Sequence, residues 1–348
     1  MNAQRVLVTG HKGYVGSVLV TVLREGGHEV HGMDTDYYRG CDLLPPPVVP
    51  ETMKDLRDVA VEDLKGFDAI IHLAALSNDP IGNLNSRWTA SINVDGTARL
   101  AEAARQAGVR RFLFASSCIM YGLAEGSDVD ETSPLQPQTD YAASKVAAEE
   151  IISHMAGDDF VPVKLRNGTI YGVSPRMRFD TVLNSLVGAA LTTGRITVLG
   201  DGSPWRPVVH LRDVARAFRA VLEAPEADIA NQAINIGCEE LNIQVAKLAE
   251  AVQEAIPEAA LEILGRAEAD QRTYHTNFAK FARLFPDFAF EFDPRTGAAE
   301  LADGLRAVGI SEEDYRGERF TRLKRIRQLV EDGLVDDQLR WLAAREAA

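Results

Sequence analysis

Three side chains in the middle of the chain have the types and spacing needed to move a proton on and off a hydroxyl group. Tyr141 and Lys145 are four residues apart, so on a helix they share one face, one turn apart. A tyrosine with a reference pKa of about 10 is a poor base at neutral pH, but a nearby ammonium group favours its phenolate. Ser117 can donate a hydrogen bond that orients the reacting oxygen. We therefore predict Tyr141 as the acid/base, Lys145 as the group that lowers its pKa, and Ser117 as the orienting group.

Each of these residues also has a purely structural interpretation. A half-buried helix tyrosine and a lysine that reaches solvent would give the same Tyr-x-x-x-Lys spacing, and that spacing is common by chance. The context is what favours catalysis, because the motif follows Ser-Ser-x-x-x-Tyr-Gly and opens an alanine-rich helix.

The first residues of the chain have a pattern that predicts a nucleotide-binding site. An apolar run at residues 6–8 indicates a buried strand, and apolar residues at helical spacing from Val15 to Leu23 indicate a helix. The pair Gly26 and Gly27 ends that helix, as C-terminal glycines do. A strand, a glycine-rich turn and a helix form the first half of a nucleotide-binding unit.

The three glycines of the turn have separate roles in this interpretation. Gly10 allows a sharp turn, Gly13 removes the side chain that would block a pyrophosphate, and Gly16 lets the helix pack closely on the strand. The helix N-terminus then offers free N–H groups to the phosphates. A second strand, residues 28–34, ends in Asp34, whose carboxylate can bind both ribose hydroxyls of NAD and repels the 2′-phosphate of NADP.

Two further buried strands are expected at residues 67–75 and 109–117. The first ends in the small residues of the run Leu73-Ala74-Ala75, which allow the backbone to approach a cofactor, and the second ends in two hydroxyls. Ligands bind at the carboxyl ends of the strands in an open parallel sheet. The ends of both strands are therefore expected near the ligand site.

Composition and charge narrow the class of protein. A chain of 348 residues can form one large domain or two intimate ones, and its net charge of −14 argues against nucleic acid or an anionic membrane as a partner. No stretch is long and apolar enough for a membrane span, and a strand that begins at Arg5 leaves no room for a signal peptide. The cysteines, Cys41, Cys118 and Cys238, lack metal-ligand spacing, so we expect a reducing, cytoplasmic compartment and no structural metal.

Taken together, these motifs resemble the extended short-chain dehydrogenase/reductase superfamily, in its nucleotide-sugar epimerase/dehydratase branch. The G-x-x-G-x-x-G spacing, the His-Leu-Ala-Ala segment and the Ser117, Tyr141 and Lys145 set carry the resemblance over roughly residues 5–305. It implies an α/β fold, a doubly wound parallel sheet (Rossmann) with a smaller α/β substrate lobe, and NAD as cofactor. The implied cofactor residues are Gly10, Gly13, Tyr14, Val15, Gly16, Asp34, Asp42, Leu43, Leu73, Ala74, Ala75, Asn93, Ser116, Tyr141, Lys145 and Ile170.

The resemblance also implies a nucleotide-sugar site in the second half of the chain. At the position of Thr169, relatives usually carry an asparagine that contacts the diphosphate of the substrate, so this chain departs from the family pattern there. Arginines at other family positions bind phosphate. An arginine alone is more often part of a surface salt bridge, but several at family positions in an acidic protein indicate a local anion clamp. The predicted substrate residues are Ser77, Ser117, Thr169, Arg176, Arg206 and Arg272.

We predict three parts for the chain. Residues 1–171 plus 208–236 form the NAD-binding Rossmann domain, 172–207 plus 237–310 form the nucleotide-sugar lobe, and 311–348 form a C-terminal helical extension. Basic residues separate the apolar positions of the extension, Phe320, Leu323, Ile326, Leu329 and Val330. A membrane or nucleic-acid helix would fit this pattern, but acidic residues follow at once, which favours packing on its own domain or on a partner subunit.

The predicted reaction is NAD-dependent epimerisation of a nucleotide sugar, at C4, by a homodimer. The sugar would be oxidised to a keto-sugar. The keto-sugar would then rotate in the site and be reduced on its other face. The alternatives are an NAD(P)H-dependent reductase of a keto-sugar, or a regulator that senses the dinucleotide and has no chemistry. Sugar 4,6-dehydratases place an acid pair after the residue that matches Ser117, whereas this chain has Cys118 and Ile119. Loss of water is therefore not expected.

Overall fold

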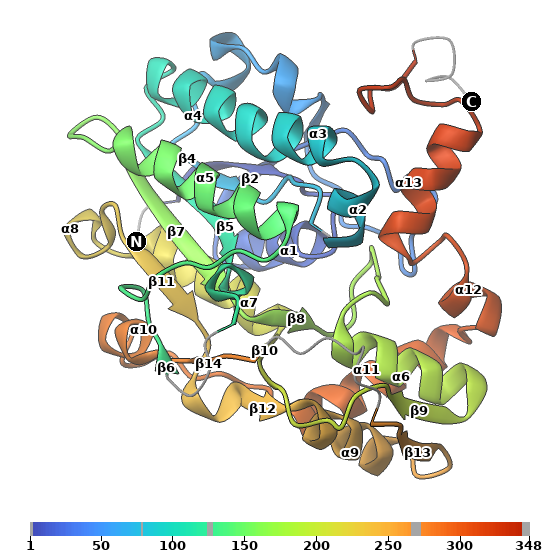
Figure 1. Cartoon of the computed structure of the whole chain (residues 1–348). Coiled ribbons are helices and arrows are strands. Elements are labelled where there is room, and N and C mark those ends of the chain that lie inside the picture. The colour runs from blue at the N-terminus through green and yellow to red at the C-terminus, as the bar shows by residue number, and fades with distance from the viewer. Residues whose placement is uncertain (1–2, 78, 124–127, 266–272, 343–348) are drawn as a thin grey trace.

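The computed structural model describes residues 3–77, 79–123, 128–265 and 273–342. Its centre is a seven-stranded parallel sheet in the order β11-β7-β5-β4-β1-β2-β3 (Figure 1). These strands are β1 (Arg5–Thr9), β2 (Glu29–Asp34), β3 (Glu51–Met53), β4 (Ala69–His72), β5 (Arg111–Ser117), β7 (Val161–Asn167) and β11 (Ala233–Ile236). The sequence analysis did not predict β3.

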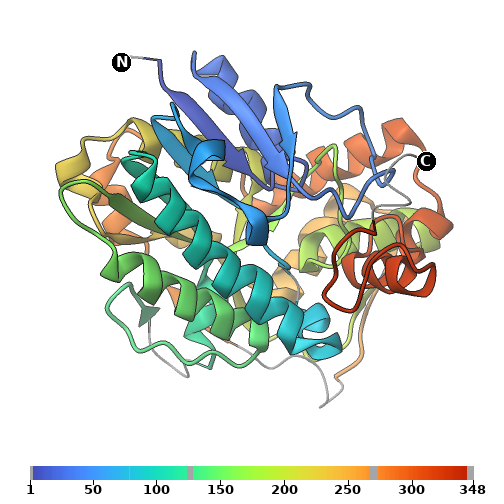
Figure 2. The ribbon, with the colours of Figure 1, turned by 90° about the horizontal axis from the view of Figure 1, so that it is seen from above.

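Helices cover both faces of this sheet. On one face α1 (Gly16–Glu25) and α7 (Leu211–Glu223) pack on alternate residues of β1, Val6 and Val8. On the other face α4 (Gly96–Gln106) and α5 (Asp140–His154) lie side by side over Leu7 and its neighbours (Figures 1 and 2). Successive residues of a strand point to opposite faces, which is why one apolar run can serve two cores. The predicted α/β class with a doubly wound parallel sheet is confirmed.

The order of the strands reverses between β1 and β4. From β1 the chain continues to β2 and β3 on one side, and from β4 it continues to β5, β7 and β11 on the other side. The helices that follow β1 and β4 leave in opposite directions there, which opens a crevice at the carboxyl ends of the two strands. This crevice is the expected place for a ligand.

The smaller part of the structure is built around short sheets (Figure 1). One of these sheets has three strands in the order β12-β10-β8. The other two sheets have two strands each, β13-β9 and β14-β6. The strands are β6 (Asp128–Val129), β8 (Thr169–Tyr171), β9 (Arg195–Val198), β10 (Trp205–His210), β12 (Asn242–Gln244), β13 (Ala260–Ile263) and β14 (His275–Thr276).

Three helices pack together in this smaller part, α6 (Val182–Thr193), α9 (Val245–Ala255) and α11 (Pro294–Val308). Their apolar residues share one core, for example Leu186, Leu248 and Leu301. Both segments that the sequence analysis assigns to the substrate lobe contribute to this core. The boundaries between domains stay a prediction. The remaining α-helices are α2 (Asp79–Leu84), α3 (Ser86–Thr89), α8 (Glu226–Ile229), α10 (Ala279–Leu284), α12 (Glu312–Arg316) and α13 (Arg322–Glu331).

The C-terminal extension packs on its own chain. Ile326 and Leu329 of α13 are fully buried against Tyr37, Ile81 and Trp88, which lie beside the end of β2 and on α2 and α3. Among the described residues, no helix has the length and apolar character required to cross a bilayer.

Candidate active site

A cavity of about 700 Å³ opens at the carboxyl ends of β1, β4 and β5. Most of the predicted site residues line it, although they come from distant parts of the chain. From the cofactor set these are Gly10, Gly13, Tyr14, Val15, Gly16, Asp34, Leu73, Ala74, Ala75, Ser116, Tyr141, Lys145 and Ile170. From the substrate set these are Ser77, Ser117, Thr169 and Arg206.

The glycine turn forms one wall of the cavity. Gly10 has φ +75°, and a Cβ at this position would lie 2.7 Å from the backbone nitrogen of Ala74. A Cβ at Gly16 would lie 2.1 Å from the carbonyl oxygen of Gly10, whereas one at Gly13 would meet only that oxygen, at 3.0 Å. Gly10 and Gly16 are therefore required by packing, and Gly13 keeps the cavity side of the turn open. In the first turn of α1, the backbone N–H of Ser17 donates to the carbonyl of Gly13 at 3.1 Å and that of Leu19 to the carbonyl of Val15 at 2.9 Å.

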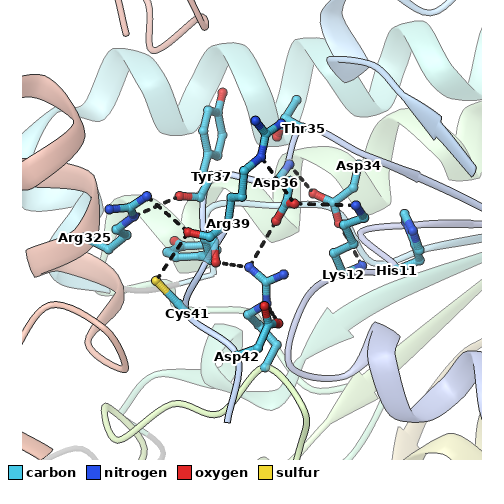
Figure 3. Close-up of polar contacts among 12 residues, drawn as sticks. His11, Lys12, Asp34, Thr35, Asp36, Tyr37, Arg39, Cys41, Asp42 and Arg325 are labelled. Carbon is cyan, nitrogen blue, oxygen red and sulfur yellow. Dashed lines mark hydrogen bonds and ion pairs between the residues drawn. The ribbon is translucent and has the colours of Figure 1, made fainter. Parts of the chain in front are cut away.

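Asp34 ends β2 and faces this turn (Figure 3). Its carboxylate accepts hydrogen bonds from the backbone N–H of Lys12, at 3.0 Å, and of Asp36, at 2.8 Å. Burial raises the pKa of Asp34. The ammonium of Lys12 lies 3.5 Å from Asp36 and 3.0 Å from Glu51. Acidic and basic side chains alternate around Asp34 in the cavity wall, since Asp36 and Asp55 line it together with Lys12 and Lys54.

The three catalytic candidates meet at the opposite end. Ser117 is the last residue of β5, and Tyr141 lies in the first turn of α5, which is capped by the Thr139 hydroxyl. Lys145, one turn further, is buried, and its Nζ donates to the carbonyl of Ala115 at 2.8 Å. The Nζ atom lies 5.8 Å from the centre of the Tyr141 ring. The strand and the helix thus bring all three side chains to the cavity wall.

The surroundings shift the pKa values of this pair in opposite directions. Burial lowers the pKa of Lys145 to about 7, against the opposing charge of Glu149. Burial raises the pKa of Tyr141, the charge of Arg178 lowers it, and Asp79 raises it. The cation that acts on Tyr141 in this ligand-free arrangement is therefore Arg178, whereas the sequence analysis assigned that effect to Lys145.

Arg178 is a site residue that sequence analysis missed. It lines the cavity, forms an ion pair with Asp180, and its Nη atoms lie 3.3 Å from the hydroxyl and from the carbonyl of Ser77. The predicted residue, Arg176, does not line the cavity. It is buried against Asp36 at 3.0 Å and Asp42 at 2.9 Å. The two arginines lie in one basic segment, and of the two only Arg178 lines the cavity.

Asp42 and Leu43, an acid followed by an apolar residue in the predicted cofactor set, show a similar difference. Asp42 and Leu43 lie outside the cavity, because Asp42 pairs with Arg176 and the N–H of Leu43 donates to the carbonyl of Pro175 at 2.7 Å. Asp55 and Leu56, directly after β3, line the cavity instead. They have the same acid–apolar pattern, and recognition of the short strand β3 would have found them.

Of two other predicted residues, Asn93 and Arg272, the structure describes only Asn93. Asn93 is buried outside the cavity wall, where it bonds the backbone N–H of Leu76 at 2.8 Å and the hydroxyl of Ser144 at 3.0 Å. It thereby supports both the loop after β4 and the catalytic helix, without reaching a ligand. Arg272 lies outside the described residues. Within the described ranges, no group of His, Cys, Asp and Glu side chains could hold a metal ion.

Comparison with known proteins agrees with this geometry. The model of the family described as "NAD dependent epimerase/dehydratase family" matches residues 6–237, more than half of the chain. An uncharacterized UDP-glucose epimerase of Bacillus subtilis, YtcB, is 28% identical over 342 residues, with 90% of this chain and 100% of the relative covered. The dTDP-D-glucose 4,6-dehydratase of Mus musculus is 28% identical over 272 residues, which cover 75% of each chain.

Among solved structures, MoeE5 in complex with UDP-glucuronic acid and NAD has a TM-score of 0.76 and 29% identity, over 87% of this chain and 99% of its own. The match of the family, the fold and the glycine turn beside Asp34 agree with one another. The chain therefore belongs to the NAD dependent epimerase/dehydratase family, with NAD as its cofactor.

Proposed function

We propose that the protein is a nucleotide-sugar epimerase that acts at C4 through a transient keto-sugar and regenerates its NAD in each turnover. The observation that carries this proposal is the meeting of Ser117, Tyr141 and Lys145 in one cavity with the glycine turn. The relative in Bacillus subtilis is named as a UDP-glucose epimerase, and MoeE5 binds UDP-glucuronic acid with NAD. Both support a uridine diphosphate sugar as the substrate class.

The residues at the glycine turn and at the end of β2 support the binding of NAD in this cavity. Gly13 leaves the turn open to a diphosphate, the N-terminal end of α1 with its partial positive charge adjoins this turn, and Asp34 lines the cavity, where the two hydroxyls of a ribose could donate to it. Bound there, NAD would accept a hydride from the sugar carbon and later return it.

The protein side chains handle the proton. Tyr141 would take the proton of the sugar hydroxyl as the carbon is oxidised and return it when the keto group is reduced. Ser117 would donate a hydrogen bond to the same oxygen, which holds it in line with Tyr141. Lys145 would place its ammonium beside the ribose and the tyrosine, provided that ligand binding raises its pKa again.

The dehydratases among the relatives make loss of water the principal rival reaction. Cys118 is fully buried and its Sγ lies 3.3 Å from the carbonyl oxygen of Arg166, while Ile119 lines the cavity but cannot transfer a proton. The carboxylates that do line the cavity near Tyr141 have partners, since Asp180 is paired with Arg178 and Asp79 accepts from Thr139 at 2.7 Å. This arrangement supports epimerisation over dehydration.

A product assay tests the proposal. The purified protein, incubated with UDP-glucose, UDP-galactose, UDP-glucuronic acid or dTDP-glucose and no added cofactor, should convert at least one of them to its 4-epimer, measured by proton NMR. NADH should not accumulate in proportion to product. A product one water lighter in the mass spectrum would contradict the proposal, and oxidation of added NADH in equal amount to product would identify a reductase.

A substitution of Asp34 tests the orientation of the dinucleotide. Asp34→Asn should weaken NAD binding about tenfold and reduce the preference for NAD over NADP, because the ribose loses a charged acceptor and the 2′-phosphate loses a repelling carboxylate. Titration of both dinucleotides measures the ratio. Asp303→Asn, a change of an exposed acid on α11, is the control. Equal affinity of the unaltered protein for both dinucleotides would remove Asp34 from this role.

A substitution of Cys118 tests whether its thiol takes part in proton transfer. Burial raises the pKa of Cys118 to about 12, and the side chain points away from the cavity, so the thiol cannot act as an acid or base there. Cys118→Ala should keep turnover within about threefold of the unaltered enzyme, after correction for the folded fraction, since only packing is lost. A loss comparable with that of a catalytic substitution would place the thiol in the reaction.

A further inference from the structure

Arg322 brings a buried positive charge from the C-terminal extension into the wall of the active-site cavity. It is the first residue of α13, only 4% exposed, and it lines the cavity together with Tyr38 and Arg178. Its guanidinium carbon lies 4.0 Å from the centre of the Tyr38 ring. The family match ends at residue 237, so this arginine lies outside the part of the chain that the family describes.

The guanidinium of Arg322 is only partly satisfied by the protein. Its Nη2 donates to the carbonyl oxygen of Arg176 at 3.0 Å, whereas its buried Nη1 has no hydrogen-bond partner among the described residues. No carboxylate in that part of the chain forms an ion pair with it, since Asp180 pairs with Arg178, and Asp36 and Asp42 pair with Arg176. Burial lowers the pKa of Arg322. Asp180, the ion-pair partner of Arg178, acts on this charge from further away and raises that pKa. A buried charge with an unsatisfied N–H and no ion-pair partner of its own costs free energy, so this position is one that an anion would stabilise.

Several contacts hold the extension, and with it Arg322, in place. The Tyr37 hydroxyl donates to the carbonyl of Leu339 at 2.5 Å, and the Trp341 indole donates to the carbonyl of Thr35 at 2.7 Å. Arg325 donates to the carbonyls of Tyr37 and Arg39 at 3.3 and 3.2 Å (Figure 3). The extension is therefore hydrogen-bonded to the loop that directly follows Asp34. These bonds fix the position of α13 relative to Asp34.

The charges of the two lining arginines, Arg178 and Arg322, both act on Asp180. Arg178 contacts Ser77 and lowers the pKa of Tyr141, so it is near the catalytic end. Arg322 stacks on Tyr38, and its charge acts on Asp180, the ion-pair partner of Arg178. An anionic group placed between them would face two planar, always charged donors, the arrangement in which arginine binds phosphate and carboxylate best.

We propose that Arg322 and Arg178 together bind one anionic oxygen group of a ligand in this cavity, a phosphate or a carboxylate, and that the C-terminal extension exists in part to supply this contact. The proposal deepens the proposed function and rests on it. The anion has three possible sources with the same chemistry: the diphosphate of NAD, the diphosphate of the nucleotide sugar, or a carboxylate on the sugar ring.

Binding measurements on the full chain separate these sources. Arg322→Met removes the charge and keeps the length of the side chain, and Arg327→Met, an exposed position on the same helix, is the matched control. Protein freed of bound nucleotide is titrated with three probes, NAD, UDP-glucose and UDP-glucuronic acid, by isothermal titration calorimetry. Arg322→Met should weaken at least one probe about tenfold or more, while Arg322→Lys should recover part of the loss.

Which probe is weakened identifies the source. A loss for NAD alone assigns the site to its diphosphate, an equal loss for both nucleotide sugars assigns it to theirs, and a loss for UDP-glucuronic acid alone assigns it to the sugar carboxylate. Unchanged affinity for all three probes would overturn the proposal. These measurements need no turnover, so a protein that binds the probes without epimerising them would refute the proposed function and leave this inference standing.

A stability measurement separates anion binding from a structural role. Arg322→Met removes a buried charge together with the hydrogen bond to the carbonyl of Arg176 and the contact with Tyr38, so the informative quantity is the rise in Tm on adding the affected probe, which should become smaller. A lower Tm of ligand-free Arg322→Met with an undiminished rise for every probe, and Arg327→Met unchanged, would assign Arg322 to support of the fold and would also overturn the proposal.

Discussion

Replacement of Tyr141 by phenylalanine is expected to lower turnover by about 10²-fold or more and to leave the fold and NAD binding in place. Only the hydroxyl is lost, and the ring keeps its position in the first turn of α5. No other described side chain is placed to take over, because Ser117 is a poor base and Asp79 already caps the helix through Thr139. Single-turnover rates of hydride transfer, followed by NADH absorbance, measure the effect where chemistry limits the rate.

The pH dependence of the same enzyme gives a second measurement. Because burial raises the pKa of Tyr141, most of the phenol is protonated at neutral pH, and the rate of sugar oxidation should rise as the pH is raised. Tyr141→Phe should lack this rise. Tyr315→Phe, which removes a hydroxyl outside the cavity, is the control. A Tyr141→Phe enzyme with a near-normal single-turnover rate would refute the acid/base assignment.

Replacement of Lys145 by methionine is expected to lower activity about 10²-fold and, unlike the tyrosine substitution, to weaken NAD binding as well. The ammonium is the group that would serve both the ribose and the phenolate. Burial lowers the pKa of Lys145 to about 7, so in the ligand-free protein much of it is neutral above that pH. Binding of an anionic dinucleotide favours the charged form, and above about pH 7 it should therefore take up protons.

Calorimetry of NAD binding in buffers of different ionisation enthalpy measures this proton uptake. The unaltered protein should take up a fraction of a proton at pH 8 and less at pH 6, and Lys145→Met should lose most of the difference. The lowered pKa also links pH to stability. Between about pH 7 and the reference value of about 10.4, the unfolded chain binds more protons at Lys145, so stability should rise with pH. Lys145→Met should show a weaker rise, and an identical rise would contradict the lowered pKa.

Local patterns were enough to predict the parts of the site that depend on sequence neighbours. The glycine turn, the acid at the end of β2 and the Tyr-x-x-x-Lys pair are each set within one strand-turn-helix unit or one helical turn. Short-range geometry determines where such residues point, because neither a turn nor a helix face needs distant contacts to form. For this reason Gly13, Asp34 and Lys145 reached the cavity as expected.

The family resemblance was transferred less reliably where the chain is irregular. Asp42 and Arg176 were chosen because their residue types fitted the family pattern, yet they pair with each other outside the cavity. Asp55 and Arg178 line the cavity instead. No periodic pattern governs these segments, so the nearest partner in space decides the direction of each side chain.

The sequence by itself determined the class of fold, the glycine turn and the shared helix face of Tyr141 and Lys145, because periodic apolar residues and fixed spacings carry that information locally. Only the tertiary structure decided which charges face the ligand. Arg322 is far from every motif along the chain, and it reaches the cavity because Ile326 and Leu329 bury α13 against Tyr37 and its neighbours. The apolar spacing of the extension predicts that this helix packs on something, but not on which surface, because the residues that receive it lie about 240 to 290 positions earlier in the chain.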